Sequence, residues 1–169
     1  MDRVIRFTCG FCGEDHEGAP SVAYKAPDSC HAIPEDERGD NTRLQADFCM
    51  VEARDYFIRC TLEVPIHDCD DTFMWGVWLR VAYDDFMDYW EHFEENDREG
   101  RYTGWLGNRF PVYPNTLDLA GCAILRPQGK RPVIELDPTD HPLSIDVRNG
   151  ISWEKAIEIA EIAMHRHDR

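Results

Sequence analysis

The chain has 169 residues and a formal net charge of -15 at pH 7, from 33 acidic residues against 18 Lys and Arg. A surface this negative repels phosphate backbones and anionic lipid head groups, which excludes nucleic acids and membranes as expected partners and favours a basic protein. Hydrophobic residues make up 43% of the chain, enough for one folded core. Seven cysteines, an odd number, and the lack of a secretory leader predict a cytoplasmic protein with reduced thiols.

We expect a single domain over residues 1–169, with a metal knuckle at 5–18 and an α+β body at 19–169. The knuckle region contains three glycines, which favours a compact turn over a helix. Residues 34–38 predict one or two helical turns or, alternatively, a charged surface turn.

The middle of the chain reads mainly as β-structure. Residues 48–66 are rich in β-formers and end near Pro65, which predicts one or two strands. Residues 73–81 are apolar at nearly every position, which is typical of a central strand covered on both faces.

Helical spacing follows at once. Phe86, Tyr89, Trp90 and Phe93 recur at helical intervals and predict a helix over 83–96. Residues 119–125 and 132–136 predict two antiparallel strands joined by a turn that contains Pro and Gly. Ser152 is a good N-cap for a terminal helix near 152–166, which ends in cationic residues. Together these elements predict an α+β fold, in which an antiparallel or mixed sheet is packed by the two main helices.

The sharpest chemical signal is the Cys9-x2-Cys12 pair, followed by Gly13. A tight turn of this form aims two thiolates at one ion, and tetrahedral zinc then needs two more ligands. His16 is a candidate third ligand, and the spacing leaves Cys30, His31 and Cys49 open for the fourth. Four protein ligands would make the zinc structural, because no position remains for water or substrate.

Other groupings carry weaker signals. His67–Asp71 and Asp137–His141 gather side chains that bind metals or act as acid and base, although they also have the composition of ordinary polar loops. The segment 104–116 has the mixture expected of a ligand groove, for which the candidate residues are Trp105, Asn108, Arg109, Tyr113 and, from further along, His141. The alternative is a loop stiffened by proline whose aromatic residues cover the edge of the core.

Several blocks in combination resemble an uncharacterised bacterial family, domain of unknown function 2199, over about residues 7–165. The blocks are 7–13 with His16, Gly18 and Pro20, then 47–49, 57–59, 75–78, 113–117 and 136–143, followed by 150–152. The resemblance implies a stand-alone bacterial protein and no particular activity. Because Cys49 falls within one of these blocks, the resemblance points to a ligand set of Cys9, Cys12, His16 and Cys49.

Three classes of function stay open. No catalytic residue set can be assigned from the spacing, which together with the charge favours a non-catalytic, zinc-stabilised protein-binding domain with an acidic surface. One alternative is a small hydrolase or transferase that uses His67, Asp140 or His141. The other alternative is a thiol redox protein built on the Cys9–Cys12 pair, although the glycines and acids around it do not form the helix start that lowers a thiol pKa.

Overall fold

A computed structural model describes residues 5–18, 20–95 and 97–166. Two short strands, β1 (Arg6–Thr8) and β2 (Asp15–Glu17), form an antiparallel hairpin beside the main sheet. The eight strands of the main sheet in this part of the chain are β3 (Ser21–Ala23), β4 (Thr42–Leu44), β5 (Phe48–Val51), β6 (Asp55–Pro65), β7 (Thr72–Val81), β8 (Arg101–Leu106), β9 (Ala120–Ile124) and β10 (Val133–Leu136).

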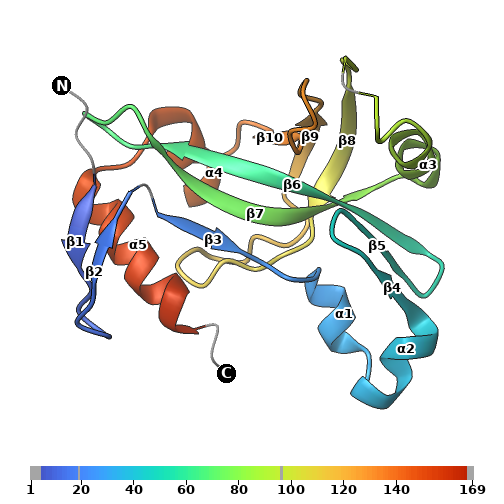
Figure 1. Cartoon of the computed structure of the whole chain (residues 1–169), viewed down its shortest axis with the longest axis horizontal. Helices are drawn as coiled ribbons and strands as arrows, with labels where there is room; N and C mark the ends of the chain where they lie inside the picture. The colour runs from blue at the N-terminus through green and yellow to red at the C-terminus, as the bar shows by residue number, and fades with distance from the viewer. Residues whose placement is uncertain (1–4, 19, 96, 167–169) are drawn as a thin grey trace.

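The helices are short and lie outside the sheet (Figure 1). They are α1 (Asp28–Ala32), the 3-10 turn η1 (Glu35–Glu37), α2 (Arg38–Asn41), α3 (Tyr83–Glu91), α4 (Pro142–Asn149) and α5 (Trp153–Arg166). Strand β7 lies between the two ends of the molecule, with α3 near one end and α5 with the β1–β2 hairpin near the other.

The longest ladder joins β6 and β7, which pair antiparallel over ten positions from Tyr56–Val81 to Pro65–Thr72. Each strand then shares its other edge between two partners. Strand β7 pairs with β3 at Met74–Gly76 and with β8 at Leu79–Val81. Strand β6 pairs with β5 along 55–58 and meets β10 at Thr61. Every other strand of the main sheet therefore pairs with β6 or β7, or with a strand that pairs with one of them.

The sheet closes on itself. Strand β8 pairs with β9, β9 with β10, and β10 returns to β6, so that β6, β7, β8, β9 and β10 form a ring of five strands. A closed sheet leaves no free edge within the ring and encloses its own core. Strands β3, β4 and β5 extend the sheet beyond the ring.

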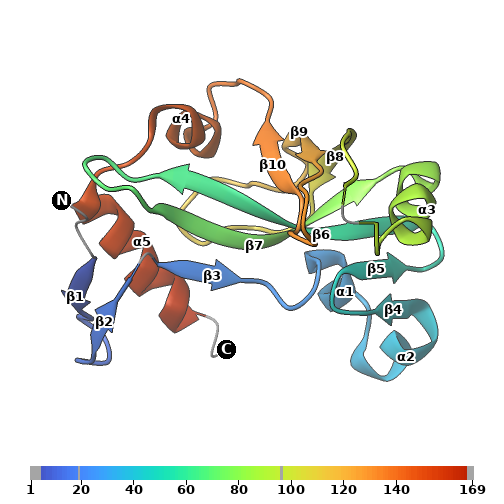
Figure 2. The ribbon, with the colours of Figure 1, turned by 45° about the horizontal axis from the view of Figure 1, so that its top comes forward.

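This arrangement overturns the expected α+β fold, in which two main helices pack an open sheet. The expected helices exist, but α3 ends at Glu91 and lies beside β6, while α5 lies beside β3 (Figure 2). The main core is built on the closed sheet, and the helices add buried residues to it, among them Phe86 of α3, Leu143 of α4 and Ala160 of α5. The prediction failed because the sequence period shows which face of a strand is buried, whereas ring closure depends on which distant strands meet.

Strand β8 explains part of the incorrect fold prediction. Its side chains alternate between exposed and buried along Arg101–Leu106, which is the pattern of a strand with one covered face. Gly104 lies directly opposite Gly121 of β9, and a Cβ on Gly121 would lie 2.6 Å from the carbonyl oxygen of Glu135. These glycines permit a close approach of neighbouring backbones, whereas the sequence had placed Gly104 in a loop.

Several local predictions are confirmed. Strands occupy 48–51, 55–65, 72–81, 120–124 and 133–136, and the last two pair antiparallel as expected. Helical turns lie near 35–41, and the hydroxyl of Ser152 accepts a hydrogen bond from the backbone N–H of Lys155 at the start of α5. Within the described residues, no helix has the length and apolar character needed to cross a bilayer.

We expect Gly121→Ala to destabilise the protein by about 3 kcal/mol, because the added methyl overlaps backbone in the ring. Gly39→Ala is the matched control: a Cβ there meets nothing within 4 Å and the residue lies in α2, so the change should stabilise the protein by up to about 1 kcal/mol. Urea unfolding followed by circular dichroism measures both. Equal stability of the two variants would show that the glycine is not required for closure.

Candidate functional site

The Cys9–Cys12 segment is the turn of the β1–β2 hairpin, and its backbone is held by two hydrogen bonds. The N–H of Cys9 donates to the carbonyl oxygen of Glu14 at 2.9 Å, and the N–H of Gly13 donates to that of Cys9 at 2.9 Å. Gly13 has a φ of 72°, in the left-handed region that favours glycine. The sequence therefore forms a tight turn that directs both cysteine side chains to one side.

Three donor atoms converge beside this turn. The sulfurs of Cys9 and Cys12 and a ring nitrogen of His165 all lie within 4.8 Å of one another. Sγ of Cys9 is 3.0 Å from Nε2 of His165. Ligands of a tetrahedral zinc ion are about 3.5–3.8 Å apart, given the usual zinc–sulfur and zinc–nitrogen bond lengths. A small opening of this cluster would therefore fit an ion, and thiolate with imidazole is a donor set that suits zinc.

A second group shares Cys12. Sγ of Cys12 lies 3.7 Å from Nε2 of His16, and a carboxylate oxygen of Glu14 completes this group within 4.8 Å. The ring of His16 is stacked on Phe7 with the ring centroids 5.2 Å apart. His16 and Glu14 are consequently the nearest described candidates for a fourth ligand.

The environment of Cys9 favours the thiolate that a metal requires. Its side chain is buried, with 2% of the residue exposed. The backbone N–H of Cys12, with smaller contributions from Phe11 and the ring of His165, lowers the pKa of Cys9 to about 6 despite the opposing effect of desolvation. A thiolate near neutral pH suits both metal binding and nucleophilic chemistry.

Helix α5 brings two side chains to the turn. Glu161 and His165 are four residues apart and so lie on one face of the helix. Oε1 of Glu161 accepts a hydrogen bond from the backbone N–H of Gly10 at 2.7 Å, and the ring of His165 lies 5.1 Å from that of Phe11. Helix α5 therefore holds the backbone of the turn through Glu161 and supplies a candidate ligand, His165.

Sequence reasoning had assigned His165 only a favourable charge at the end of a helix. The available signal was the four-residue spacing of Glu161 and His165, but nothing in the sequence indicated that this face meets a turn 156 residues away.

The structure places Cys49 in a different part of the molecule. It is fully buried in β5, and its sulfur lies 3.5 Å from that of Cys30 in α1. Cys30, Cys49 and Trp78 belong to a small apolar cluster beneath α1. The hydrogen bond with Cys30 and burial raise the pKa of the Cys49 thiol, which is the opposite of the change at Cys9. The residues expected to share an ion are therefore divided: Cys9, Cys12 and His16 lie together, and Cys49 does not join them.

Most residues of the expected ligand groove have structural partners. Asn108 is fully buried: its Oδ1 accepts from the N–H of Trp78 at 2.9 Å, and its Nδ2 donates to the carbonyl oxygen of Ala26 at 2.9 Å. The hydroxyl of Tyr113 donates to Asp146 at 2.7 Å, and burial together with this carboxylate raises the Tyr113 pKa. These two side chains fasten strands and helices together.

The remaining groove residues are dispersed. Trp105 projects from β8 with 40% of its surface exposed, and the Arg80 guanidinium lies 5.5 Å from its ring centroid. Arg109 is exposed and lines a shallow hollow with Asp28 and Arg80. His141 instead caps α4, where its Nδ1 accepts from the N–H of Leu143 at 3.1 Å.

The two histidines considered for catalysis have structural contacts. Since Nδ1 of His141 is an acceptor, its Nε2 carries the proton and faces the carbonyl oxygens of Pro114 and Asn115 at 3.2 Å. Nε2 of His67 lies 2.8 Å from the carbonyl oxygen of Asn149. Neither histidine lines one of the hollows described in this chain.

The chain belongs to the family DUF2199, described as uncharacterised proteins conserved in bacteria, which matches residues 8–151. The matched region includes Cys9, Cys12 and His16 and ends before α5, which supplies His165. Comparison with curated proteins and with solved structures found no match.

Replacement of Asn108 by alanine should cost on the order of 3 kcal/mol in stability, because a buried N–H and a buried carbonyl lose their partners. Arg109→Ala removes the neighbouring exposed side chain and should change stability by less than about 0.5 kcal/mol. Thermal and urea unfolding compare the two variants. A stable Asn108→Ala protein would mean that the amide has a role other than support.

Proposed function

We propose that this protein is a non-catalytic binding domain with an acidic surface, and that one zinc ion fastens its N-terminal hairpin to its C-terminal helix. The observation that carries the metal part is the convergence of Cys9, Cys12 and His165 within 4.8 Å. His16 or Glu14 completes the coordination after a small movement of the hairpin, since both already lie beside Cys12. A site closed by four protein ligands leaves no place for a substrate.

The surroundings of the Cys9–Cys12 pair favour a structural metal site over a redox site. A redox thiol needs access to its substrate, whereas Cys9 is buried against the ring of His165. The cysteine pair lies in a hairpin turn and not at the start of a helix. Coordination also uses the thiolate that the backbone N–H of Cys12 stabilises.

The enzyme alternative has less support. His67 and His141 each bond to backbone carbonyl groups, and Asp140 is exposed in the loop before α4. A general base needs a free nitrogen or carboxylate within reach of a bound substrate. The binding function fits the charge, because 15 excess negative charges attract a basic partner and repel nucleic acid.

The metal is tested by measuring zinc in protein purified without a metal-affinity column. The wild-type protein should contain about one equivalent of zinc, and His165→Ala and Cys12→Ser should contain close to none. Metal loss should also reduce the free energy of unfolding by several kcal/mol, on the order expected when a structural zinc is removed.

Two matched variants control for residue type. His31→Ala removes an exposed histidine and Cys49→Ser alters a buried cysteine outside the cluster, so both should keep their zinc. Wild-type protein without zinc would overturn the proposed fastening. Loss of zinc in Cys49→Ser, but not in His165→Ala, would instead favour the ligand set suggested by sequence.

The binding function is tested by capture of bacterial proteins on the immobilised protein at low and at high salt. We expect the captured proteins to be basic and to be released as salt rises towards about 0.5 M, because screening weakens contacts between exposed charges. An unrelated protein of equal net charge serves as the control. An identical set of proteins on both would contradict a specific binding function.

A further inference from the structure

We propose that a groove beside the end of α3 is the docking site for a basic segment of a protein partner, which rests on the binding function proposed above. The groove, called here the α3 groove, is lined by residues 45–47 of the β4–β5 turn and Phe48 of β5, by Trp90 and Glu91, and by residues 93–95. It lies at the end of the molecule away from the β1–β2 hairpin (Figure 1).

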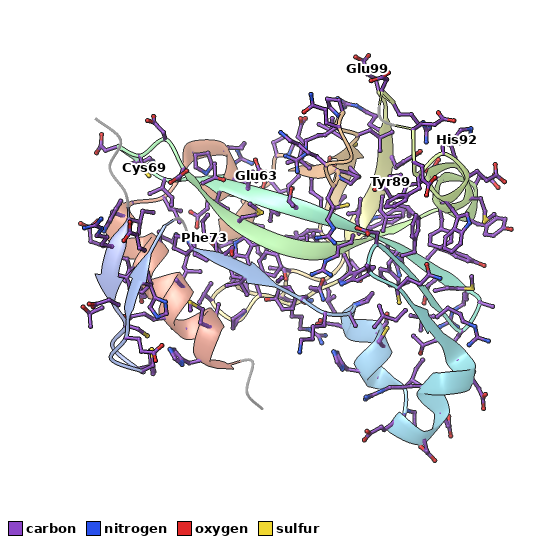
Figure 3. All side chains as sticks on the ribbon, viewed as in Figure 1. Glu63, Cys69, Phe73, Tyr89, His92 and Glu99 are labelled. Carbon is purple, nitrogen blue, oxygen red and sulfur yellow. The ribbon has the colours of Figure 1, made fainter. Side chains whose placement is uncertain are left out.

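The apolar part of the α3 groove is aromatic. Trp90 and Phe93 are 44% and 42% exposed, although both contact the buried ring of Phe48, with ring centroids 4.7 and 5.1 Å apart. Tyr89, the residue before Trp90, is buried and also contacts Phe48, with ring centroids 5.3 Å apart. Figure 3 shows Tyr89 at α3, on the side of the helix that faces the strands. The two exposed rings are therefore held in position by a packed base, which is the condition for a preformed anchor site.

The opposite wall is also fixed. The N–H of Gln45 donates to the carbonyl oxygen of Phe48 at 2.8 Å across the turn. Asp47 is held twice: its carbonyl oxygen accepts from the N–H of Arg59 at 3.0 Å, and its carboxylate pairs with Nε of Arg131 at 2.7 Å. A rigid wall loses little conformational entropy when a partner binds.

The rim of the α3 groove has unbalanced negative charge. Glu91, Glu94 and Glu95 are exposed, and within the described residues none of these carboxylates pairs with a cation. They surround the C-terminal end of α3, where the helix dipole already favours cations and where the last turn contains no basic residue. Glu94 and Glu95 also line a neighbouring hollow that contains three cations. Arg98 pairs with Asp88 at 2.6 Å and Arg126 pairs with Glu63 at 3.1 Å, whereas Lys130 is exposed.

These features select one occupant. A second copy of this chain would bring three more glutamates to the same rim, and like charges across an interface are unfavourable. Nucleic acids and anionic lipids are repelled for the same reason. The Arg or Lys side chains of a basic segment would pair with the exposed carboxylates or form a cation–π contact with Trp90. An apolar side chain of the same segment would pack against Phe93.

The test uses a labelled synthetic peptide of twelve residues, in which four arginines flank two central leucines, and fluorescence anisotropy of its binding to the full chain. Glu94→Gln with Glu95→Gln should weaken binding about fivefold, as expected for the loss of two exposed charge contacts. Trp90→Ala should weaken binding at least about tenfold, as expected for an aromatic anchor. Circular dichroism and thermal unfolding establish that each variant is folded.

The matched charge control is Glu154→Gln with Glu158→Gln, which removes the same charge from exposed positions on α5. Binding by this control should stay within about twofold of wild type, because those charges lie far from the α3 groove. Equal weakening by the two double variants, or none by either, would overturn the α3 groove as the site while leaving the acidic binding function in place. No binding of the peptide by the wild-type protein would also overturn the α3 groove as a site for basic segments, whereas the capture experiment described above decides the binding function separately.

Discussion

The β6–β7 ladder is the constraint on which the rest of the structure depends. Its ten paired positions hold two long strands together, and every other strand of the main sheet attaches to an edge of that pair or to a strand that does. Because β8 and β10 attach to opposite edges, the chain between them can close the ring. The early part of the chain needs the same ladder, since β3 pairs with β7 in parallel and β5 pairs with β6. A change that shortened this ladder would remove the attachment points of both ends of the molecule.

The β1–β2 hairpin has the weakest support from the sheet. Its strands have three residues each, and a two-stranded hairpin of this length is marginal in water. Ile5 is fully buried in the main core, and Glu161 of α5 holds the backbone of the turn. The hydrogen bond between Gly10 and Glu161 joins positions 151 residues apart, so part of the support of the hairpin comes from the opposite end of the chain. A metal at Cys9, Cys12 and His165 would act where the fold has least support of its own.

Local structure was predictable from the sequence to the extent that neighbouring residues determine it. The apolar run of 73–81 and the cap at Ser152 each depend on residues close in the chain, and both predictions are confirmed. Ring closure and the meeting of His165 with Cys9 depend on pairings between distant segments, which a hydrophobic period does not encode. Cys49 is a second case in which the sequence did not predict which distant residues meet. A family-like sequence block made it a candidate ligand, whereas its sulfur contacts Cys30 in the interior.

The kinds of polar groups that gather at each end make the two ends of the molecule chemically different. At the hairpin end, sulfur and imidazole donors face one another, and a carboxylate from α5 is already used to hold the backbone. At the α3 end, exposed carboxylates that form no ion pair within the described part of the chain surround exposed aromatic rings. The ring of strands between the ends is filled with buried apolar side chains, so it can keep both surfaces in place without taking part in either. The donor group at the hairpin and the α3 groove have no residue in common, so a substitution in one leaves the side chains of the other unchanged.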